Sequence, residues 1–517
     1  MFLELLLLIA FKIEQYIDTI TDSVFVNLTS TDKKIILKSI STNSYKYIEI
    51  ASSLEQQIYD GVLKLGDKLP SLRVLQQEYG VSISTVLQAY YQLEAKSLIE
   101  PKAKSGYFVI FCSADIPKNP GKSSPDQSSV KSSSTEIIVD FFQNLSIEKG
   151  VDFSLGVPSK ELLPIAKLNK VIHEAIISLP QGGSAQGDIL GRENLRRQIA
   201  RRSILWGGKL TENDIIITSG CTSALSFSLM TVTNPGDTIA VESPVYFGLL
   251  QLAKTLGLRV LELPTDPLSG IDLNALEKAI ENNDIKTIAI ISNFNNPMGN
   301  TMSNNGKKAL VEIIQKHRIP LIEDDIYGDI YYGASRPTTC KTYDDSGLVI
   351  LCGSFSKTLA CGYRVGWVVP GNYFDEIVKL KLYLASTTAT ITEEALALFL
   401  EKGRYDHHLR KLRHTLHANS LKFLKAIVAY FPKNTRVSKP KGGFLLWVEL
   451  SNSINTEVLY KLAESEEIRF FPGKIFTLQD QYTNCLRLSY GLVWNEEIDN
   501  ALNRLGMLVK NYEKLKR

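Results

Sequence analysis

The sequence predicts two folded domains, a small and mostly helical N-terminal module and a large α/β domain with a mostly parallel sheet. Three observations predict this organisation. The first is the length, because 517 residues exceed what one ordinary hydrophobic core holds. The second is a stretch rich in serine and proline over residues 112–135. The third is the alternation of apolar strands with helices that follows this stretch.

Residues 1–43 form an extension to which we assign no role. Its apolar run, FLELLLLIAF, covers about ten residues and includes Glu4, whereas a membrane span needs roughly 20. A basic n-region and a small-residue cleavage site are also missing from it. An amphipathic helix packed on the rest of the chain is one interpretation. We expect a cytoplasmic protein with no membrane segment, whose six cysteines form no CxxC pair and stay reduced.

The N-terminal module, residues 44–111, begins with a predicted helix over 48–62. Apolar residues four apart give that helix one buried face: Ile50, Leu54, Ile58 and Val62. A second helix opens at Pro70-Ser71 and ends at Gly80, because glycine breaks the pattern. Ser82 is the expected N-cap of a third helix.

The third helix has an apolar face and a polar N-terminal face. The apolar face comprises Val86, Ala89, Tyr90 and Leu93, and the polar residues that point away from it are Ser84, Thr85 and Gln88. Two helices around a glycine turn, with polar side chains at the start of the second, are typical of a recognition helix in the DNA major groove. LIEP and GYFVI then flank a short turn, which predicts a β-hairpin wing.

The module resembles the winged helix-turn-helix of the GntR family through LPSLRVL, GVSISTVLQAYYQLE and SGYFV, in that order. The resemblance implies DNA binding, with Arg73 on a phosphate and the hydroxyls of Ser84 and Thr85 on phosphate or base edges. The further DNA-binding candidates are Ser71, Ser82, Lys104 and Gly106. Many relatives carry arginine in place of Ile83, and the seven basic residues of 44–111 are balanced by seven acidic ones. A winged helix that binds protein therefore stays an alternative.

Residues 112–135 separate the module from the large domain. They contain eight serines, three prolines and almost no large apolar side chain, a composition typical of a flexible linker. A coil of this length spans roughly 25–30 Å.

The large domain, residues 136–517, alternates strands and helices. Continuous apolar runs predict that TIAVES (238–243) and TIAIISNF (287–294) are buried strands. Three further strands are predicted at IIITSG (215–220), IPLIEDD (319–325) and GLVILCGSFS (347–356). Helices are predicted after IIITSG, at CTSALSFSLM, and before IPLIEDD, at KKALVEIIQKH. This alternation predicts a mostly parallel α/β sheet.

Several segments that follow these strands carry candidate chemistry. Lys357 lies in GSFSKTLACGYRVGW, where a Schiff-base lysine would need close approach by a cofactor aldehyde. Asp324, in EDDIY, is a carboxylate at a strand end that suits a protonated pyridine nitrogen. TSGCTSAL offers the free amides of a helix N-terminus to an anion. NFNNPMG and ESPVY are the two remaining segments. Each segment alone has a structural alternative: a solvated lysine at Lys357, a helix cap in EDDIY, a plain turn in NFNNPMG and a core tyrosine in ESPVY.

Together and in this order, the segments resemble the fold-type I pyridoxal-phosphate enzymes, the aminotransferase superfamily, over about residues 136–517. The resemblance implies pyridoxal 5'-phosphate as cofactor and a smaller C-terminal α+β subdomain. It implies that Lys357 forms the internal aldimine, that Asp324 pairs with the pyridine nitrogen and that Tyr246 stacks on the ring. The residues implied at the ring hydroxyl are Asn296 and Tyr327, and those at the phosphate are Cys221, Thr222, Ser354, Ser356 and Arg364. Arg487, with Asn296, would bind the α-carboxylate of a substrate.

The chain departs from this superfamily at two places. Relatives often carry Ser-Gln where this chain has Cys-Thr at 221–222, so contacts by these two side chains are in doubt. Relatives also place a tyrosine at Gln186, and that tyrosine reaches the phosphate bound in the partner subunit. A separate stretch, HHLRKLRHTLH at 407–417, fits no common zinc spacing, and we expect a basic surface helix without a metal.

A GntR-type reader, a linker and an aminotransferase-like domain in this order resemble the MocR-type regulators. The resemblance implies a homodimer that binds a double-stranded DNA operator and senses pyridoxal phosphate or an amino compound through aldimine formation. The alternatives are a working aminotransferase with an accessory DNA-binding module, and a pyridoxal-phosphate enzyme of another reaction type, such as a lyase.

Overall fold

A computed structural model describes residues 46–95, 98–102, 105–110, 117–131, 150–333 and 335–516. The extension over residues 1–43 lies outside these ranges. The chain divides into two compact units, Met1–Ser113 and Ala114–Arg517. No helix in the described ranges is both long and apolar enough to cross a membrane.

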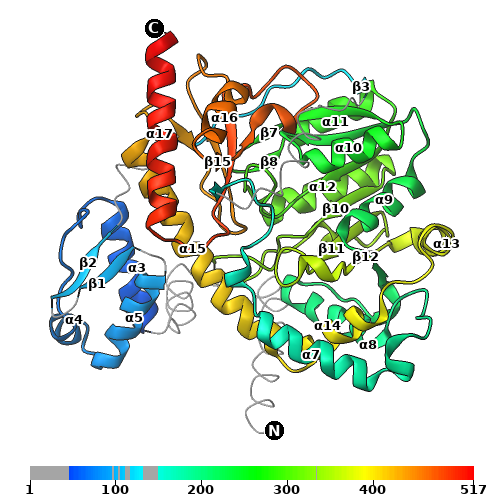
Figure 1. Cartoon of the computed structure of the whole chain (residues 1–517), viewed down its shortest axis with the longest axis horizontal. Helices are drawn as coiled ribbons and strands as arrows, with labels where there is room; N and C mark the ends of the chain where they lie inside the picture. The colour runs from blue at the N-terminus through cyan, green and yellow to red at the C-terminus, as the bar shows by residue number, and fades with distance from the viewer. Residues whose placement is uncertain are drawn as a thin grey trace, which may run out of the picture. The chain divides into compact units, whose positions relative to one another are not determined.

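The first unit contains three helices and a hairpin, drawn in blue and cyan in Figure 1: α3 (Lys46–Tyr59), α4 (Leu72–Tyr79), α5 (Ile83–Ala95), β1 (Ile99–Lys102) and β2 (Gly106–Val109). The Ser71 side chain caps α4 by accepting from the Val74 amide, and Gly80 ends it in the left-handed conformation with φ 61°. The apolar face predicted for the third helix is 0–1 % exposed in α5. β1 and β2 pair in antiparallel register, which confirms the predicted wing.

One residue of the first predicted helix is placed wrongly by the sequence pattern. Ile50, Leu54 and Ile58 are buried on α3, but Val62 is 67 % exposed. α3 ends at Tyr59, and Gly61 takes a left-handed φ of 72° that turns the chain before Val62 can join the face.

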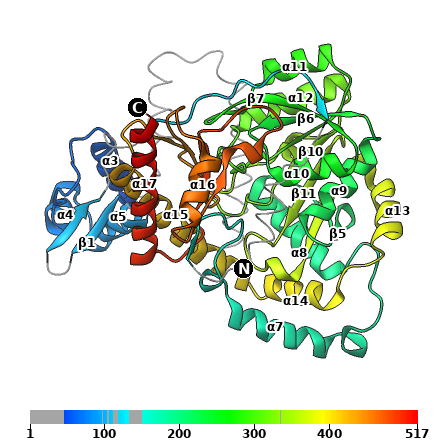
Figure 2. The same cartoon turned by 45° about the horizontal axis from the view of Figure 1, so that its top comes forward.

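The second unit is built on a nine-stranded sheet with the order β3-β7-β6-β9-β10-β11-β12-β5, in which β8 pairs with β7 (Figures 1 and 2). Its strands are β3 (Val130–Lys131), β5 (Ile216–Thr218), β6 (Thr238–Ser243), β7 (Arg259–Asp266), β8 (Gly270–Ile271), β9 (Ile285–Ile290), β10 (Leu321–Asp324), β11 (Val349–Ser354) and β12 (Gly366–Val369). The central strands from β7 to β11 are parallel, whereas β12 runs antiparallel to both of its neighbours. The predicted mostly parallel sheet is confirmed.

Helices cover both faces of this sheet, because alternate residues of each strand are apolar on opposite sides. One face packs against α9 (Cys221–Val232), α10 (Phe247–Thr255) and α13 (Phe374–Leu384). The other face packs against α11 (Leu273–Asn282) and α12 (Asn304–His317) at one end, and α7 (Ile165–Ser178), α8 (Glu193–Ser203) and α14 (Thr390–Glu401) at the other.

A smaller α+β subdomain follows. Its antiparallel sheet has the order β13-β14-β17-β16, from β13 (Arg436–Val437), β14 (Leu445–Glu449), β16 (Phe471–Pro472) and β17 (Cys485–Ser489). Its helices are α15 (Arg404–Tyr430), α16 (Thr456–Glu464) and α17 (Glu496–Lys516), seen beside the sheet in Figure 2. β4 (Val151–Asp152) pairs in parallel with β15 (Ile468–Arg469) and joins the segment before α7 to this subdomain. The expected C-terminal subdomain is therefore present.

The stretch 112–135 was expected to be a flexible coil, but its described part, residues 117–131, lies against the second unit. The Val437 amide donates to the Lys118 carbonyl at 2.9 Å, and Lys122 pairs with Asp272 at 2.5 Å. β3 adds to the sheet edge beside β7. Serine hydroxyls and backbone groups of this stretch form hydrogen bonds with the second unit, for example Ser123 with Thr265. Its composition alone therefore does not predict that it packs against the domain.

Candidate cofactor site

The residues predicted at the cofactor site are brought to one edge of the large sheet. β6, β9, β10 and β11 are parallel, so their carboxyl ends lie at the same edge. Asp324 is the last residue of β10, and Lys357 lies three residues after β11. Tyr246 precedes α10, and Cys221 opens α9 directly after Gly220.

Lys357 lies in a partly buried loop with its amine turned inward. Its Nζ donates to the Gly156 carbonyl oxygen at 2.5 Å. Burial lowers the pKa of this amine, and the nearby charges of Arg487 and Asp324 act in opposite directions on it. A lowered pKa leaves more of the amine neutral, which is the form that attacks an aldehyde.

Asp324 presents a buried carboxylate at the end of β10. The residue is 6 % exposed, and burial raises its pKa to about 6. Its Oδ1 accepts from the Ile326 amide at 3.1 Å and from the Cys221 thiol at 3.3 Å. The thiol therefore contacts the carboxylate, whereas the family resemblance implied that Cys221 contacts the phosphate. Burial likewise raises the pKa of the Cys221 thiol, which stays protonated and donates.

Arg487 is a buried cation on β17 that lies near Tyr327 and Asn296. It is 1 % exposed, and its Nη1 donates to Asn296 Oδ1 at 3.2 Å while Nη2 donates to the Ser154 carbonyl. Burial lowers its pKa to about 10, so it remains charged at neutral pH. Its Nε has no hydrogen-bond partner among the described residues, and none of their carboxylates forms a salt bridge with it. A buried guanidinium in this state suits an anionic ligand.

Hydroxyls and backbone amides gather near the start of α9. Ser354 Oγ donates to the Val365 carbonyl at 2.9 Å and lies 2.7 Å from Ser356 Oγ, which therefore donates to it. Arg364 is exposed, with its Nη2 3.2 Å from the Ser219 carbonyl. A Cβ at Gly220 would lie 2.4 Å from Arg364 Nη2, so glycine permits this close approach. Thr222 is exposed beside them. Free amides of a helix N-terminus and a guanidinium fit a phosphate, and the two serine hydroxyls would donate to it after giving up these internal partners.

These groups fit pyridoxal phosphate by their chemistry. The inward amine of Lys357 suits the aldehyde, the carboxylate of Asp324 suits the ring nitrogen, and the orphaned Nε of Arg487 suits a carboxylate. Tyr246 is partly buried, and burial raises its pKa to about 12, so its hydroxyl stays neutral.

Two site residues escaped the sequence patterns. Gly156 and Ser154 contact Lys357 and Arg487 through their carbonyl oxygens, and they lie in SLGVPS after β4. Their one sequence signal is a run of small residues around a Gly and a Pro. Gly248 also matters, because a Cβ there would lie 2.4 Å from Tyr246 Cζ, so the ring can fold over it only if residue 248 lacks a side chain.

On the first unit, three of the predicted DNA-binding residues, Ser82, Ser84 and Thr85, lie together at the start of α5. Ser82 Oγ lies 2.7 Å from Ser84 Oγ and 2.8 Å from Thr85 Oγ1, and it caps the helix by accepting from the Thr85 amide. Arg73 is exposed on α4, and Ser71 caps that helix. Gly106 opens β2 with a φ of 103°, whereas Lys104 lies outside the described residues.

The histidine-rich stretch 407–417 lies on α15, and the prediction of a surface helix is wrong for one of its faces. His408, Leu409, Leu412 and Leu416 are buried. The described residues contain no cluster of three or more His, Cys, Asp or Glu side chains that could hold a metal. Gln186, in contrast, is exposed on the single chain.

Comparisons with known proteins match both units of the chain to families. Residues 148–505 match the family Aminotransferase class I and II, and residues 46–109 match Bacterial regulatory proteins, gntR family. The chain is 38% identical over 464 residues to the uncharacterized HTH-type transcriptional regulator YjiR of Escherichia coli (strain K12), covering 90% of this chain and 98% of that protein.

Two solved structures are similar to the second unit. The multiple substrate aminotransferase from Thermococcus profundus has a TM-score of 0.69 at 26% identity, with 74% of this chain and 96% of that chain covered. The α-aminoadipate aminotransferase LysN from Thermus thermophilus, complexed with N-(5'-phosphopyridoxyl)-L-leucine, has a TM-score of 0.68 at 26% identity, with 74% and 97% covered.

Proposed function

The chain belongs to the MocR-type regulators, which join a GntR reader to an aminotransferase class I and II domain. We propose that its pyridoxal-phosphate site senses an amino compound and controls DNA binding. The chain is a PLP-dependent transcriptional regulator of this type. One observation supports a sensing role: the same chain carries two kinds of site. The start of α5 is polar and exposed, and the second unit holds a buried site that suits an aldehyde and a carboxylate.

In the proposed site, Lys357 bonds covalently to the cofactor and Asp324 holds its ring nitrogen. Asn296 and Tyr327 hydrogen-bond the ring hydroxyl, and Tyr246 stacks on the ring. The phosphate is held by Thr222, Ser354, Ser356 and Arg364, and by the backbone amide rather than the thiol of Cys221. Arg487 binds the carboxylate of the effector, because its Nε is the free donor of a buried cation.

An effector that carries both an amine and a carboxylate would act at two points: its amine at the bond between Lys357 and the cofactor, and its carboxylate at Arg487. Its carboxylate would bind the free Nε of Arg487, beside the groups that already contact this guanidinium, the Ser154 carbonyl and the Asn296 side chain. These partners belong to the segment before α7 and to the loop after β9, so the effector acts on two parts of the fold at once. A regulator needs such differential contacts between its free and bound states.

We propose that DNA is contacted by Arg73, Ser71, Ser82, Ser84, Thr85, Gly106 and Lys104. The reader carries no net charge, so a homodimer is needed to double the phosphate contacts over two half-sites. Because its proposed partner is DNA, we also propose that the protein is cytoplasmic.

The deciding experiment measures binding of the full chain to the DNA upstream of its own gene, with and without pyridoxal phosphate and a panel of amino acids. Retardation of this DNA that changes with cofactor and amine supports the regulator. Fast transamination of the same amino acids with no DNA retardation would favour an aminotransferase with an accessory module, which the full complement of site residues permits.

A further inference from the structure

We propose that Tyr405 and Asp329 are positioning residues that hold Lys357 in place through a buried polar chain running from Thr358 to Asp325. Neither residue belongs to the cofactor site described above. The proposal rests on the proposed covalent role of Lys357, and it assigns a function to charged side chains that the site does not use.

Thr358, the residue after Lys357, is held by α15 from two sides. Tyr405 Oη lies 2.7 Å from Thr358 Oγ1, and His408 Nε2 lies 2.7 Å from the Thr358 carbonyl oxygen. Tyr405 and His408 are three residues apart, so they project from the same face of the helix. A carbonyl oxygen only accepts, so His408 Nε2 carries the proton, and burial lowers the pKa of this ring and favours its neutral form.

The direction of the hydrogen bonds follows from the proton count. Tyr405 Oη also lies 3.1 Å from Asp329 Oδ2. Although burial raises the pKa of Asp329, the charges of Arg202 and Arg336 outweigh it and hold this pKa well below its usual range. Asp329 is therefore an acceptor. The one proton of Tyr405 Oη lies between two acceptors, Thr358 Oγ1 at 2.7 Å and Asp329 Oδ2, while the Thr358 hydroxyl donates to the Phe355 carbonyl oxygen at 3.5 Å.

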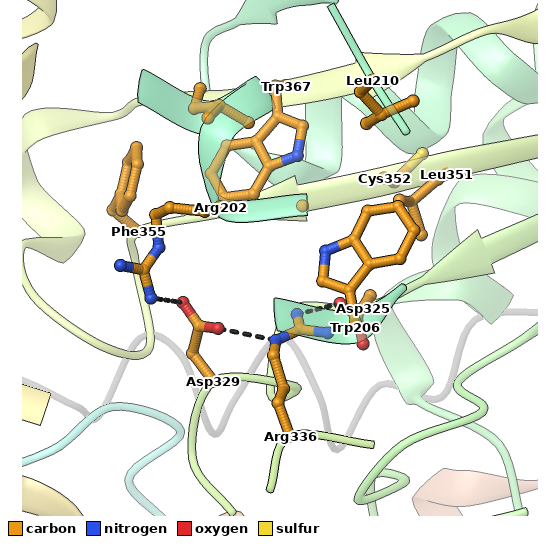
Figure 3. A pocket seen from close by; sticks show the side chains of 12 residues that line it. Arg202, Trp206, Leu210, Asp325, Asp329, Arg336, Leu351, Cys352, Phe355 and Trp367 are labelled. Carbon is orange, nitrogen blue, oxygen red and sulfur yellow. Dashed lines mark hydrogen bonds and ion pairs between the residues drawn. The ribbon is translucent and has the colours of Figure 1, made fainter. Parts of the chain in front are cut away.

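Asp329 continues the polar chain through Arg336 to Asp325, as Figure 3 shows. It accepts from Arg202 Nη2 at 3.2 Å and from Arg336 Nε at 2.7 Å. Arg336 Nη2 donates in turn to Asp325, the residue that follows Asp324 in the chain. The Asp325 carboxylate also accepts from Asn293 at 3.0 Å, so its position is held from a second side.

The polar chain therefore joins the two loops that carry the covalent and the ring-nitrogen contacts. One end is Thr358, next to Lys357, and the other is Asp325, next to Asp324. Figure 3 shows Trp206, Phe355 and Trp367 around the ion pairs. The apolar side chains reduce the contact of these ion pairs with water, most of all for Arg336 and Asp325, whose side chains are each 6 % exposed. Loss of the Tyr405 hydroxyl should free the loop and admit water to Lys357.

The test uses Tyr405→Phe in the full chain, because this variant keeps the buried ring and removes the hydroxyl. The measurement is the pH dependence of the rate at which pyridoxal phosphate attaches to the cofactor-free protein, with the adduct trapped by borohydride and assigned by mass spectrometry. Only the neutral amine attacks, so the midpoint reports the pKa of Lys357. Hydration should raise the midpoint by about 0.5–1 pH unit and slow attachment at neutral pH by about three- to tenfold.

Asp406→Asn is the matched control. Asp406 is the neighbour of Tyr405 on α15 and accepts from the other branch of Arg202, at 2.6 Å, but it does not contact Asp329 or Thr358. Its side chain is 52 % exposed. This variant should leave the midpoint unchanged.

Thr358→Val removes the hydrogen bond between Tyr405 and residue 358 by changing its other partner, and valine has nearly the same shape as threonine. The double variant should therefore show the same midpoint as either single variant. An unchanged midpoint in both Tyr405→Phe and Thr358→Val, or shifts that add in the double variant, overturns the positioning role. If the wild type forms no adduct on Lys357, the proposed function fails instead, whatever the variants do.

Discussion

Replacing Asp324 with asparagine should stabilise the cofactor-free protein while weakening its hold on pyridoxal phosphate. Burial raises the pKa of this carboxyl from 3.8 to about 6. A difference of about 2 units corresponds to about 3 kcal/mol by which the charged form destabilises the fold at pH 7. Asparagine has no charge to desolvate and keeps an oxygen to accept from Ile326 and Cys221, although its new amide donors offset part of the gain.

The pH dependence has a definite sign. Because the folded pKa is raised, the folded state holds a proton that the unfolded state has released between about pH 4 and 6. The stability contributed by protonated Asp324 is complete below the unfolded pKa and is lost as the pH rises through about 6. The advantage of the asparagine variant should therefore be largest at pH 7 and shrink by about 1 kcal/mol at pH 5.

Calorimetric melting of the cofactor-free full chain measures this effect, with wild type and Asp324→Asn compared at pH 7 and pH 5. We expect the melting transition of the aminotransferase-like unit to rise by a few degrees at pH 7 and by less at pH 5. Pyridoxal phosphate should bind the variant about tenfold or more weakly, since a hydrogen bond to a charged group is worth about 1.5–3 kcal/mol. A variant that melts with the wild type at both pH values and binds the cofactor equally well would refute the reasoning.

Three further changes test the proposed function. Lys357→Ala should abolish the yellow, borohydride-reducible adduct while the fold persists, and a remaining reducible adduct would contradict the assignment of this lysine. Arg73→Ala should weaken DNA binding across sequences and reduce the slope of log affinity against log salt by about one, and an unchanged slope would remove Arg73 from the phosphate contacts. Gln186→Tyr should tighten pyridoxal phosphate by about two- to tenfold, measured from cofactor dissociation; no change would mean that residue 186 faces away from the phosphate.

The elements that sequence predicted well are those with a strong local pattern. The apolar face of α5 repeats at helical spacing, and β6 and β9 lie in largely apolar runs, so periodicity and length identify them. Boundaries were harder, because one glycine before Val62 decides whether that side chain faces the core. The site residues were found because polar groups that follow buried parallel strands meet at one edge.

What escaped prediction depends on partners far away in the chain. Gly156 contacts Lys357 across 201 residues, and no pattern within SLGVPS announces that contact. His408 reads as part of a basic surface stretch, yet the Thr358 carbonyl, 50 residues away, satisfies its ring nitrogen and allows its burial. Residues 117–131 read as a linker because their partners, such as Asp272, are also distant.

The cofactor site holds three ionisable groups whose charged forms are disfavoured by burial. Burial lowers the pKa of Lys357 and that of Arg487, and it raises the pKa of Asp324. The cofactor offers an aldehyde to Lys357 and a protonated ring nitrogen to Asp324, and the effector offers a carboxylate to Arg487. Binding then stabilises the folded domain in proportion to the logarithm of ligand concentration over Kd. A domain whose stability follows its ligand in this way can change how firmly it holds the segments around the site, including the segment before α7 that contacts Arg487. Such a response is what a sensor requires, whether or not turnover follows.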